Sequence, residues 1–242
     1  VPVSVKAWKT GGSRMFIREG TEVRLEDLLR GIIIQSGNDA SVAVAEYIAG
    51  SEDVFADVMN QTAISLGMTN TQFKNATGLP QEGHYTTAKD LSILAARIIQ
   101  DFPDTYPIYE EKNFTYNGIK QANRNSLLFR DPTVDGLKTG HTEEAGYCLV
   151  ASAERDGFRL ISVVMGTASE KAREQETTKF TQTTGIGCVS GCGKCCTSTH
   201  VEASPLEFLP WAFHLFLNGE AEKMLALLNE NLPVILLSPE DK

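Results

Sequence analysis

Two short polar motifs contain residues that could do chemistry. The first is Ser36-Gly37-Asn38, and the second is Lys138-Thr139-Gly140, which His141 follows. A hydroxyl, an amide and an amine can move protons and hold a polar substrate. Alone, Ser-x-Asn suits an interhelix turn, and a single strand lysine is usually solvated. In this order and about 100 residues apart, the two motifs are more informative together than either is alone.

A cluster of cysteines forms a third candidate site. Cys188, Cys192, Cys195 and Cys196 lie within nine residues, whereas Cys148 stands alone in the first 187. Such clustering is more typical of metal or redox sites than of a disulfide framework. Thiolates at this spacing could hold zinc or an iron–sulfur centre. Adjacent cysteines seldom both bind one ion, so the metal site remains one alternative.

The elements that must position the first motif are helical. Apolar residues at three- and four-residue spacing predict helices from Val23 to Ile34 and from Ala40 to Ile48. The polar run 36–39 interrupts them, and a polar loop between two buried helices tends to project into a cleft. Further helices are predicted over 51–66, with Ser51 as N-cap, and from Thr86 or Thr87 to Ile99.

The elements around the second motif are strands. Alternating residues predict strands at 114–119, 134–140, 147–153 and 158–165, with a hairpin turn at Arg155-Asp156-Gly157. The last three should lie side by side in one antiparallel sheet, where Cys148 is expected to be a small buried hydrophobic residue. A helix over 171–180 should cover the sheet. Helices first and sheet later indicate an α+β class.

Composition limits the function classes. The chain has 242 residues, 42% hydrophobic and 22% charged, with a formal net charge of −9, which is the balance of a globular protein and argues against a nucleic-acid partner. No segment reaches the roughly 18 to 20 apolar residues that cross a bilayer, and residues 1–12 lack the plan of a signal peptide.

Three runs closely resemble the low-molecular-mass penicillin-binding proteins that act as D-alanyl-D-alanine carboxypeptidases of bacterial cell walls. They are Gln35 to Asp39, Asn117 to Asn125 and Val134 to Thr142, and the resemblance extends over about residues 1–180. It implies a penicillin-binding-protein/β-lactamase-like transpeptidase fold, with an antiparallel sheet flanked by helices and a helical subdomain. It also implies serine-type removal of the terminal D-Ala from peptidoglycan pentapeptide, with β-lactams as inhibitors, at the periplasmic face of the membrane.

The resemblance also implies roles for individual residues. Ser36 would relay protons to the leaving group, Asn38 would hold the substrate peptide, and Lys138 would supply a positive charge. Thr139, Gly140 and His141 would line the strand that pairs with the substrate. Arg124 and Arg173 are candidates for the terminal carboxylate. As alternatives, Arg124 could pair with Asp131 or Asp135, and Arg173 with acidic residues of its own helix.

The chain departs from this family at two places. No Ser-x-x-Lys motif, which holds the nucleophile, occurs in the 242 residues, so we expect a fold incomplete at its front and doubtful turnover by this chain alone. After about residue 181 we expect an unrelated, mostly helical segment over 182–242, without the family's membrane anchor. Residues 188–196 resemble a family of small zinc- or iron-chelating proteins, and a fusion would explain both departures.

Three other functions stay open at this point. A β-lactamase shares two of the motifs. A noncatalytic module could keep the cleft to bind peptidoglycan or β-lactams. The cysteine cluster could define a metal-chelating protein.

Overall fold

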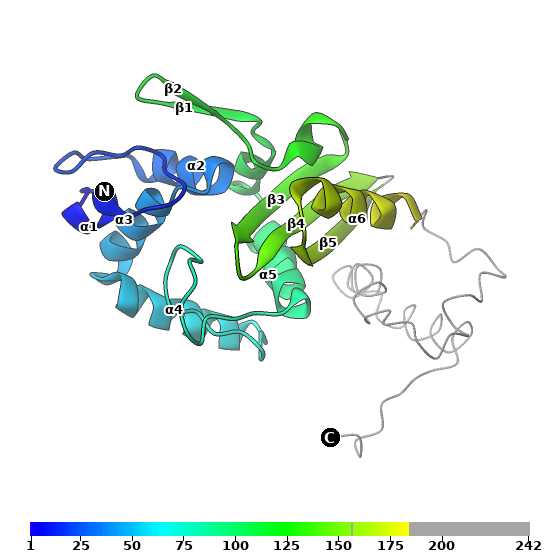
Figure 1. The fold of residues 1–242 in the computed structure, drawn as a ribbon, viewed down its shortest axis with the longest axis horizontal. Helices are drawn as coiled ribbons and strands as arrows, with labels where there is room; N and C mark the ends of the chain where they lie inside the picture. The colour runs from blue at the N-terminus through cyan, green and yellow to red at the C-terminus, as the bar shows by residue number, and fades with distance from the viewer. Residues whose placement is uncertain (156, 184–242) are drawn as a thin grey trace, which may run out of the picture.

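The computed structural model describes residues 1–155 and 157–183 (Figure 1). The helices are α1 (Val5–Lys9), α2 (Leu25–Gln35), α3 (Asn38–Ala49), α4 (Glu52–Ser65), α5 (Ala88–Asp101) and α6 (Glu170–Thr183), with short 3-10 helices η1 (Tyr106–Glu110) and η2 (Ser126–Phe129). The strands are β1 (Asn113–Tyr116), β2 (Ile119–Ala122), β3 (Val134–Thr142), β4 (Gly146–Arg155) and β5 (Phe158–Thr167).

Helices α1 to α4 form a helical unit, and its core is built by α1, α2, α3 and the segments that adjoin them. Fully buried members of that core include Met15, Ile17, Leu28, Ile34 and Val42. Each large apolar side chain contributes about 1.5–3 kcal/mol when buried. The predicted cap at Ser51 is confirmed, because its hydroxyl accepts a hydrogen bond from the Val54 N–H, and Thr87 caps α5 in the same way. Capping and burial together explain why these segments are helical.

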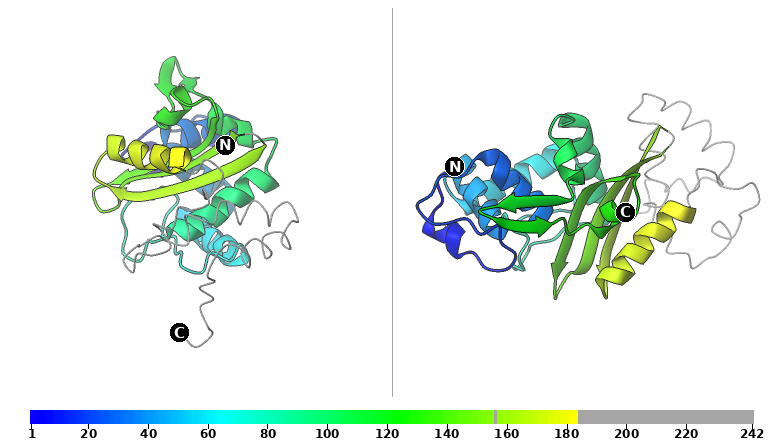
Figure 2. Two further views of the ribbon diagram at one scale, coloured as in Figure 1. Left: turned by 90° about the vertical axis from the view of Figure 1, so that its right-hand side faces the viewer. Right: turned by 90° about the horizontal axis from the view of Figure 1, so that it is seen from above.

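Strands β3, β4 and β5 form an antiparallel sheet in that order, as the sequence predicts. One face packs on α5 and η1 through Ala95, Tyr106, Leu137, Val150 and Ile161. Helix α6 lies on the opposite face, away from the helical unit (Figure 2). Because side chains alternate along a strand, Val150 and Ala151 point to different faces, and the sheet is covered on both sides.

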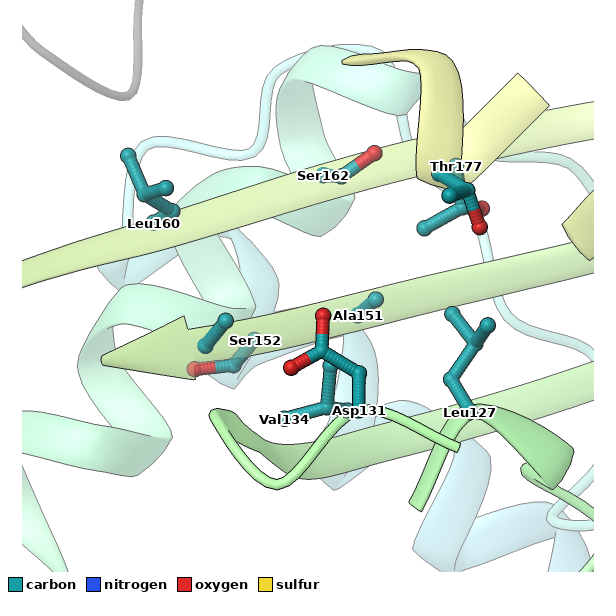
Figure 3. Close-up of a pocket in the computed structure, with 10 residues that line it drawn as sticks. Leu127, Asp131, Val134, Ala151, Ser152, Leu160, Ser162 and Thr177 are labelled. Carbon is teal, nitrogen blue, oxygen red and sulfur yellow. The ribbon is translucent and has the colours of Figure 1, made fainter. Parts of the chain in front are cut away.

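A pocket between α6 and the sheet shows how these layers meet (Figure 3). Its lining includes Leu127, Val134, Ala151, Leu160 and Thr177. None of the predicted site residues lines this pocket. It therefore belongs to the packing of α6 on the sheet.

A tight hairpin joins the helical unit to the sheet. Strands β1 and β2 pair through a turn at Asn117 and Gly118, both with positive φ, as two-residue hairpin turns require. The hairpin leads directly into the segment around Arg124. Among the helices of the described residues, none is long and apolar enough to span a bilayer.

Candidate active site

The loop between α2 and α3 presents Ser36 at a helix end. Ser36 caps α2 in the left-handed conformation, with φ 60° and ψ 40°. The N–H groups of Ser36 and Gly37 donate to carbonyl oxygens of the last turn of α2, at 3.1 and 2.9 Å. Such a cap ends a helix and usually has glycine at the left-handed position. The chain therefore turns sharply at Ser36.

Asn38 ties this loop to the segment that precedes α2. It is the first residue of α3 and only 8% exposed. Its backbone N–H donates to Ser13 O at 2.8 Å, and its side-chain Nδ2 donates to Gly11 O at 2.9 Å. A Cβ on Gly12, where φ is +80°, would lie 2.6 Å from Asn38 Nδ2. Only glycine fits at that position, so the segment can approach the Asn38 amide closely.

Asp39 is a structural member of the site, and sequence analysis assigned it no role. Its fully buried carboxylate accepts hydrogen bonds from the N–H groups of Met15, Phe16 and Ile17, at 2.8, 2.8 and 3.2 Å. Three backbone donors satisfy a charge that would otherwise be costly to bury. The feature of the sequence that could have pointed to this role is the aspartate directly after the Ser-x-Asn motif. This contact fixes the Ser36 loop against residues 15–17.

Lys138 comes from the sheet and meets Ser36 from the helical unit. Its Nζ donates to Ser36 Oγ at 2.5 Å and to Thr139 O at 2.7 Å. The structure thus brings together the two motifs that are far apart in sequence. Burial and, to a smaller extent, the positive charges of Arg124 and Arg173 together lower the pKa of Lys138 from 10.5 to about 8. A lysine with such a pKa releases its proton more readily than an exposed one.

Arg124 lies next to the Ser36 loop. Its Nε donates to Gln35 O at 2.9 Å and its backbone N–H to Ile34 O at 3.2 Å. The alternative pairing with acidic residues is not found, because Asp131 pairs with Arg155 and Asp135 with Arg159. The Arg124 side chain is exposed, so part of its guanidinium group can receive a ligand.

Arg173 lies on α6 and is only 3% exposed. Its Nε is buried without a hydrogen-bond partner among the described residues. Two acidic neighbours on its helix pair elsewhere, Glu174 with Arg130 and Glu176 with Lys179. A buried guanidinium N–H without a partner is costly, and such a group in a native structure calls for a structural or functional explanation. Its positive charge contributes to the lowered pKa of Lys138, so the two charged groups lie near one another.

Strand β3 forms one wall of the site. In the sheet as described, β3 is an edge strand that pairs only with β4, so its other edge can accept an extended peptide. Thr139 is buried, whereas Gly140 and His141 are exposed, and the His141 ring lies 3.9 Å from the Tyr147 ring, centroid to centroid. These residues stay together, as the sequence predicts.

The expectation for Cys148 was wrong. Its side chain is half-buried, opposite Gly140 in the register, and its thiol donates to Ala145 O at 3.5 Å. Gly140 has no side chain to cover it, which leaves the cysteine partly open to solvent. Nothing in the residues around it forms a metal site, since the described part of the chain contains no group of three or more potential ligands. Cys188, Cys192, Cys195 and Cys196 lie outside the described residues, and their zinc or iron site stays a prediction.

Known proteins similar in sequence to this chain are named D-alanyl-D-alanine carboxypeptidases. The chain is 47% identical over 187 residues to D-alanyl-D-alanine carboxypeptidase DacA of Escherichia coli, a match that covers 74% of this chain and 46% of that protein. DacF of Bacillus subtilis is 45% identical over 185 residues, covering 74% and 47%. The chain thus spans about half the length of the curated relatives it matches.

Solved structures agree in fold. DacD from Francisella tularensis matches with a TM-score of 0.74 and 38% identity, covering 75% of this chain and 57% of that one. Penicillin binding protein 5 from Haemophilus influenzae matches with a TM-score of 0.73 and 47% identity, covering 75% and 54%. The penicillin-binding-protein α+β fold is thereby confirmed.

The family assignment rests on most of the described chain. The sequence model of the D-alanyl-D-alanine carboxypeptidase family matches residues 1–169, the span that contains both polar motifs. The relatives are named carboxypeptidases, not β-lactamases. This chain belongs to the D-alanyl-D-alanine carboxypeptidase family.

Proposed function

We propose that this chain carries the substrate-binding part of a serine-type carboxypeptidase cleft, one that removes the terminal D-Ala from peptidoglycan pentapeptide through an acyl-enzyme. The observation that carries the proposal is the hydrogen bond from Lys138 Nζ to Ser36 Oγ, 2.5 Å long. It joins the helical unit to the edge strand of the sheet. Family membership makes D-Ala-D-Ala the substrate to test first.

Proton transfer would pass through the pair formed by Ser36 and Lys138. A serine hydroxyl both donates and accepts a hydrogen bond, so Ser36 can pass its proton to the departing D-Ala amine while it accepts another from the Lys138 ammonium group, which becomes neutral. A lysine pKa of about 8 lies close to neutral pH, where acid–base groups are most effective. The side-chain amide of Asn38 donates one N–H to Gly11 O. Its second N–H and its carbonyl oxygen would bind the substrate peptide.

Substrate binding would use the edge of β3 and the positive charges beside it. The peptide would add to the strand at Thr139 to His141, as extended ligands add to sheet edges. Its terminal carboxylate would then lie near Arg124, Lys138 and Arg173. The last two lie close enough for the charge of Arg173 to act on Lys138. Guanidinium groups match the two oxygens of a carboxylate.

Acylation requires a nucleophile that these residues do not supply. Because no Ser-x-x-Lys occurs in the 242 residues, we propose that the chain alone binds ligands without turnover. β-Lactams, which the resemblance implies as inhibitors, should occupy the same cleft. The periplasm, or the outer face of the cytoplasmic membrane, is the proposed location.

Ligand binding tests the proposal directly. Calorimetric titration should show that diacetyl-L-Lys-D-Ala-D-Ala binds the 242-residue chain more tightly than its C-terminal amide, and that Lys138→Met weakens binding of the acid by about tenfold or more. An isomer ending in L-Ala-L-Ala serves as a control for the stereochemistry. Equal binding of the acid, the amide and the L-isomer would contradict the proposal.

A further inference from the structure

Three consecutive residues, Arg124, Asn125 and Ser126, each contact a different part of the candidate site. Arg124 binds the end of α2 through Gln35 O, next to Ser36. Asn125, which is 1% exposed, donates from Nδ2 to Gly136 O at 2.9 Å, two residues before Lys138 on β3. Ser126 donates to a carboxylate oxygen of Glu174 on α6. One short segment therefore connects all the elements that carry the site.

The contact with α6 is made by a half-buried carboxylate with two partners. One oxygen of Glu174 accepts from the Ser126 hydroxyl, and the other forms an ion pair with Arg130 Nη1 at 2.5 Å. The side chain of Glu174 is 12% exposed, whereas that of Arg130 is 66% exposed. Solvent therefore screens the ion pair with Arg130, and the hydrogen bond from Ser126 is the better protected of the two contacts. Charge-assisted hydrogen bonds are about twice as strong as neutral ones. Glu174 thus fixes α6 to the η2 region.

Glu174 follows Arg173 directly, so whatever fixes Glu174 also sets the position of Arg173. Among residues 170–179, the part of α6 whose side chains the structure describes, only Ala172 is apolar. Arg173 itself has a buried Nε without a partner among the described residues. Because the Arg173 side chain is only 3% exposed, the position of its guanidinium group depends on the residues packed around it.

We propose that Ser126 and Glu174 are positioning residues, which hold Arg173 at the same cleft as Arg124 so that both guanidinium groups serve one terminal carboxylate. This inference rests on the proposed function and names the contacts that give the site its preference for a free C-terminus. Neither residue would touch the substrate. They act through Arg173.

The test measures the preference for a carboxylate on the 242-residue chain. The quantity is the ratio of the dissociation constants of the amide and the acid of diacetyl-L-Lys-D-Ala-D-Ala, obtained by calorimetry. Glu174→Ala should lower this ratio about tenfold, as expected when one charged contact is lost, and leave the amide affinity within about twofold. Removing a negative charge would, by electrostatics alone, strengthen binding of the acid. A lower ratio therefore indicates displacement of Arg173.

Matched variants keep the test decisive. Glu176→Ala removes the same charge from the same helix at an exposed ion pair and should leave the ratio unchanged. Ser126→Ala removes one of the two contacts and should lower the ratio by a smaller factor, which decides the matter if Glu174→Ala fails to fold. A second readout is the pKa of Lys138, measured by NMR, which should rise in Glu174→Ala as Arg173 moves away.

The outcomes separate the inference from the function on which it depends. If the unmodified chain does not distinguish the acid from the amide, the proposed function fails. If the unmodified chain does distinguish them and both Glu174→Ala and Ser126→Ala keep the full ratio, the function stands and the positioning role is wrong.

Discussion

Ser36 combines an unfavourable backbone conformation with a contact at the centre of the site. Its φ of 60° lies in the left-handed region, which costs a non-glycine residue about 1–2 kcal/mol. Its hydroxyl accepts the hydrogen bond from Lys138 Nζ. Strain of this kind persists where surrounding contacts or function maintain it. A serine at this position is therefore less stable than a glycine would be, but it supplies the hydroxyl that contacts Lys138.

Two substitutions at Ser36 separate strain from chemistry. Ser36→Gly and Ser36→Ala both remove the hydroxyl and should weaken ligand binding, but only glycine relieves the left-handed strain. We expect the glycine variant to be more stable than the alanine variant by about 1 kcal/mol in urea unfolding. Ser41 lies within α3, where the order should reverse, with alanine more stable than glycine by a similar amount. The same order at both positions would rule out the strain.

Lys138 should make stability depend on pH. Its pKa is about 8 in the folded chain against an ordinary value of 10.5. Between these values the unfolded chain holds more protons, so this group makes the folded state more stable as pH rises from about 8 to 10.5. The unmodified chain should gain on the order of 2 kcal/mol over this window relative to Lys138→Met. Urea unfolding of both proteins at several pH values measures the difference, and parallel pH profiles would contradict it.

Arg173→Ala provides a second check on the Lys138 pKa. The charge of Arg173 lowers the pKa of Lys138, so its removal should raise that pKa toward the ordinary value. NMR titration of the lysine side chain follows it directly. An unchanged pKa would mean that Arg173 does not lie at the site.

At the scale of elements, the Asp39 carboxylate links the start of α3 to residues 15–17. Because Asp39 lies one residue beyond Asn38, this link determines where Ser36 and Asn38 stand relative to the preceding segment. Asp39→Asn would place amide N–H groups against backbone donors. The Asp39→Asn substitution should therefore lower the free energy of unfolding by about 3 kcal/mol. Asp57→Asn, on an exposed part of α4, should change it by less than about 0.5 kcal/mol.

Urea unfolding of the Asp39→Asn and Asp57→Asn variants distinguishes two cases. If both substitutions have equal and small effects in urea unfolding, the carboxylate does not carry the contacts described. A large effect of Asp39→Asn alone supports its role in holding the loop.

The elements were predictable because their patterns are local. Helix α4 begins after a serine cap, and β4 and β5 alternate around a Gly-containing turn. The contact between Lys138 and Ser36, in contrast, depends on how the helical unit meets the sheet. Only the family resemblance, not the spacing, indicated it.

Helix α6 shows the limit of sequence patterns most clearly. Its residues are almost all polar and are typical of a solvated helix, yet Arg173 and Thr177 are buried. They lie four residues apart and so share one face, which packs on the sheet. The burial of Arg173 and the contacts of Glu174 follow from tertiary packing, which no local pattern encodes.

At the scale of the whole molecule, the site draws on the helical unit, the sheet and α6. Ser36 comes from the α2–α3 loop, Lys138 from β3 and Arg173 from α6, on the far face of the sheet (Figure 2). No single element contains the site. Its geometry therefore depends on how these layers pack, and the segment from Arg124 to Ser126 contacts each of them.

The predicted division at about residue 181 remains to be tested, since residues 184–242 lie outside the described part. Metal analysis of the purified chain would test its main chemical consequence. If the cysteine cluster holds zinc or an iron–sulfur centre, the protein should contain bound metal, and Cys192→Ser should reduce it. Cys148→Ser is the control and should leave the metal content unchanged. Protein free of metal after purification without chelators would exclude this site.

The most direct test of the account is covalent labelling with a fluorescent penicillin, measured by intact mass. It compares the 242-residue chain with a version extended upstream in its own gene through a Ser-x-x-Lys segment. The account predicts an adduct on the extended version and none on the 242-residue chain, because the cleft described here lacks the attacking serine. An adduct on the 242-residue chain would show that another of its serines attacks, and would contradict the roles assigned to Ser36 and Lys138.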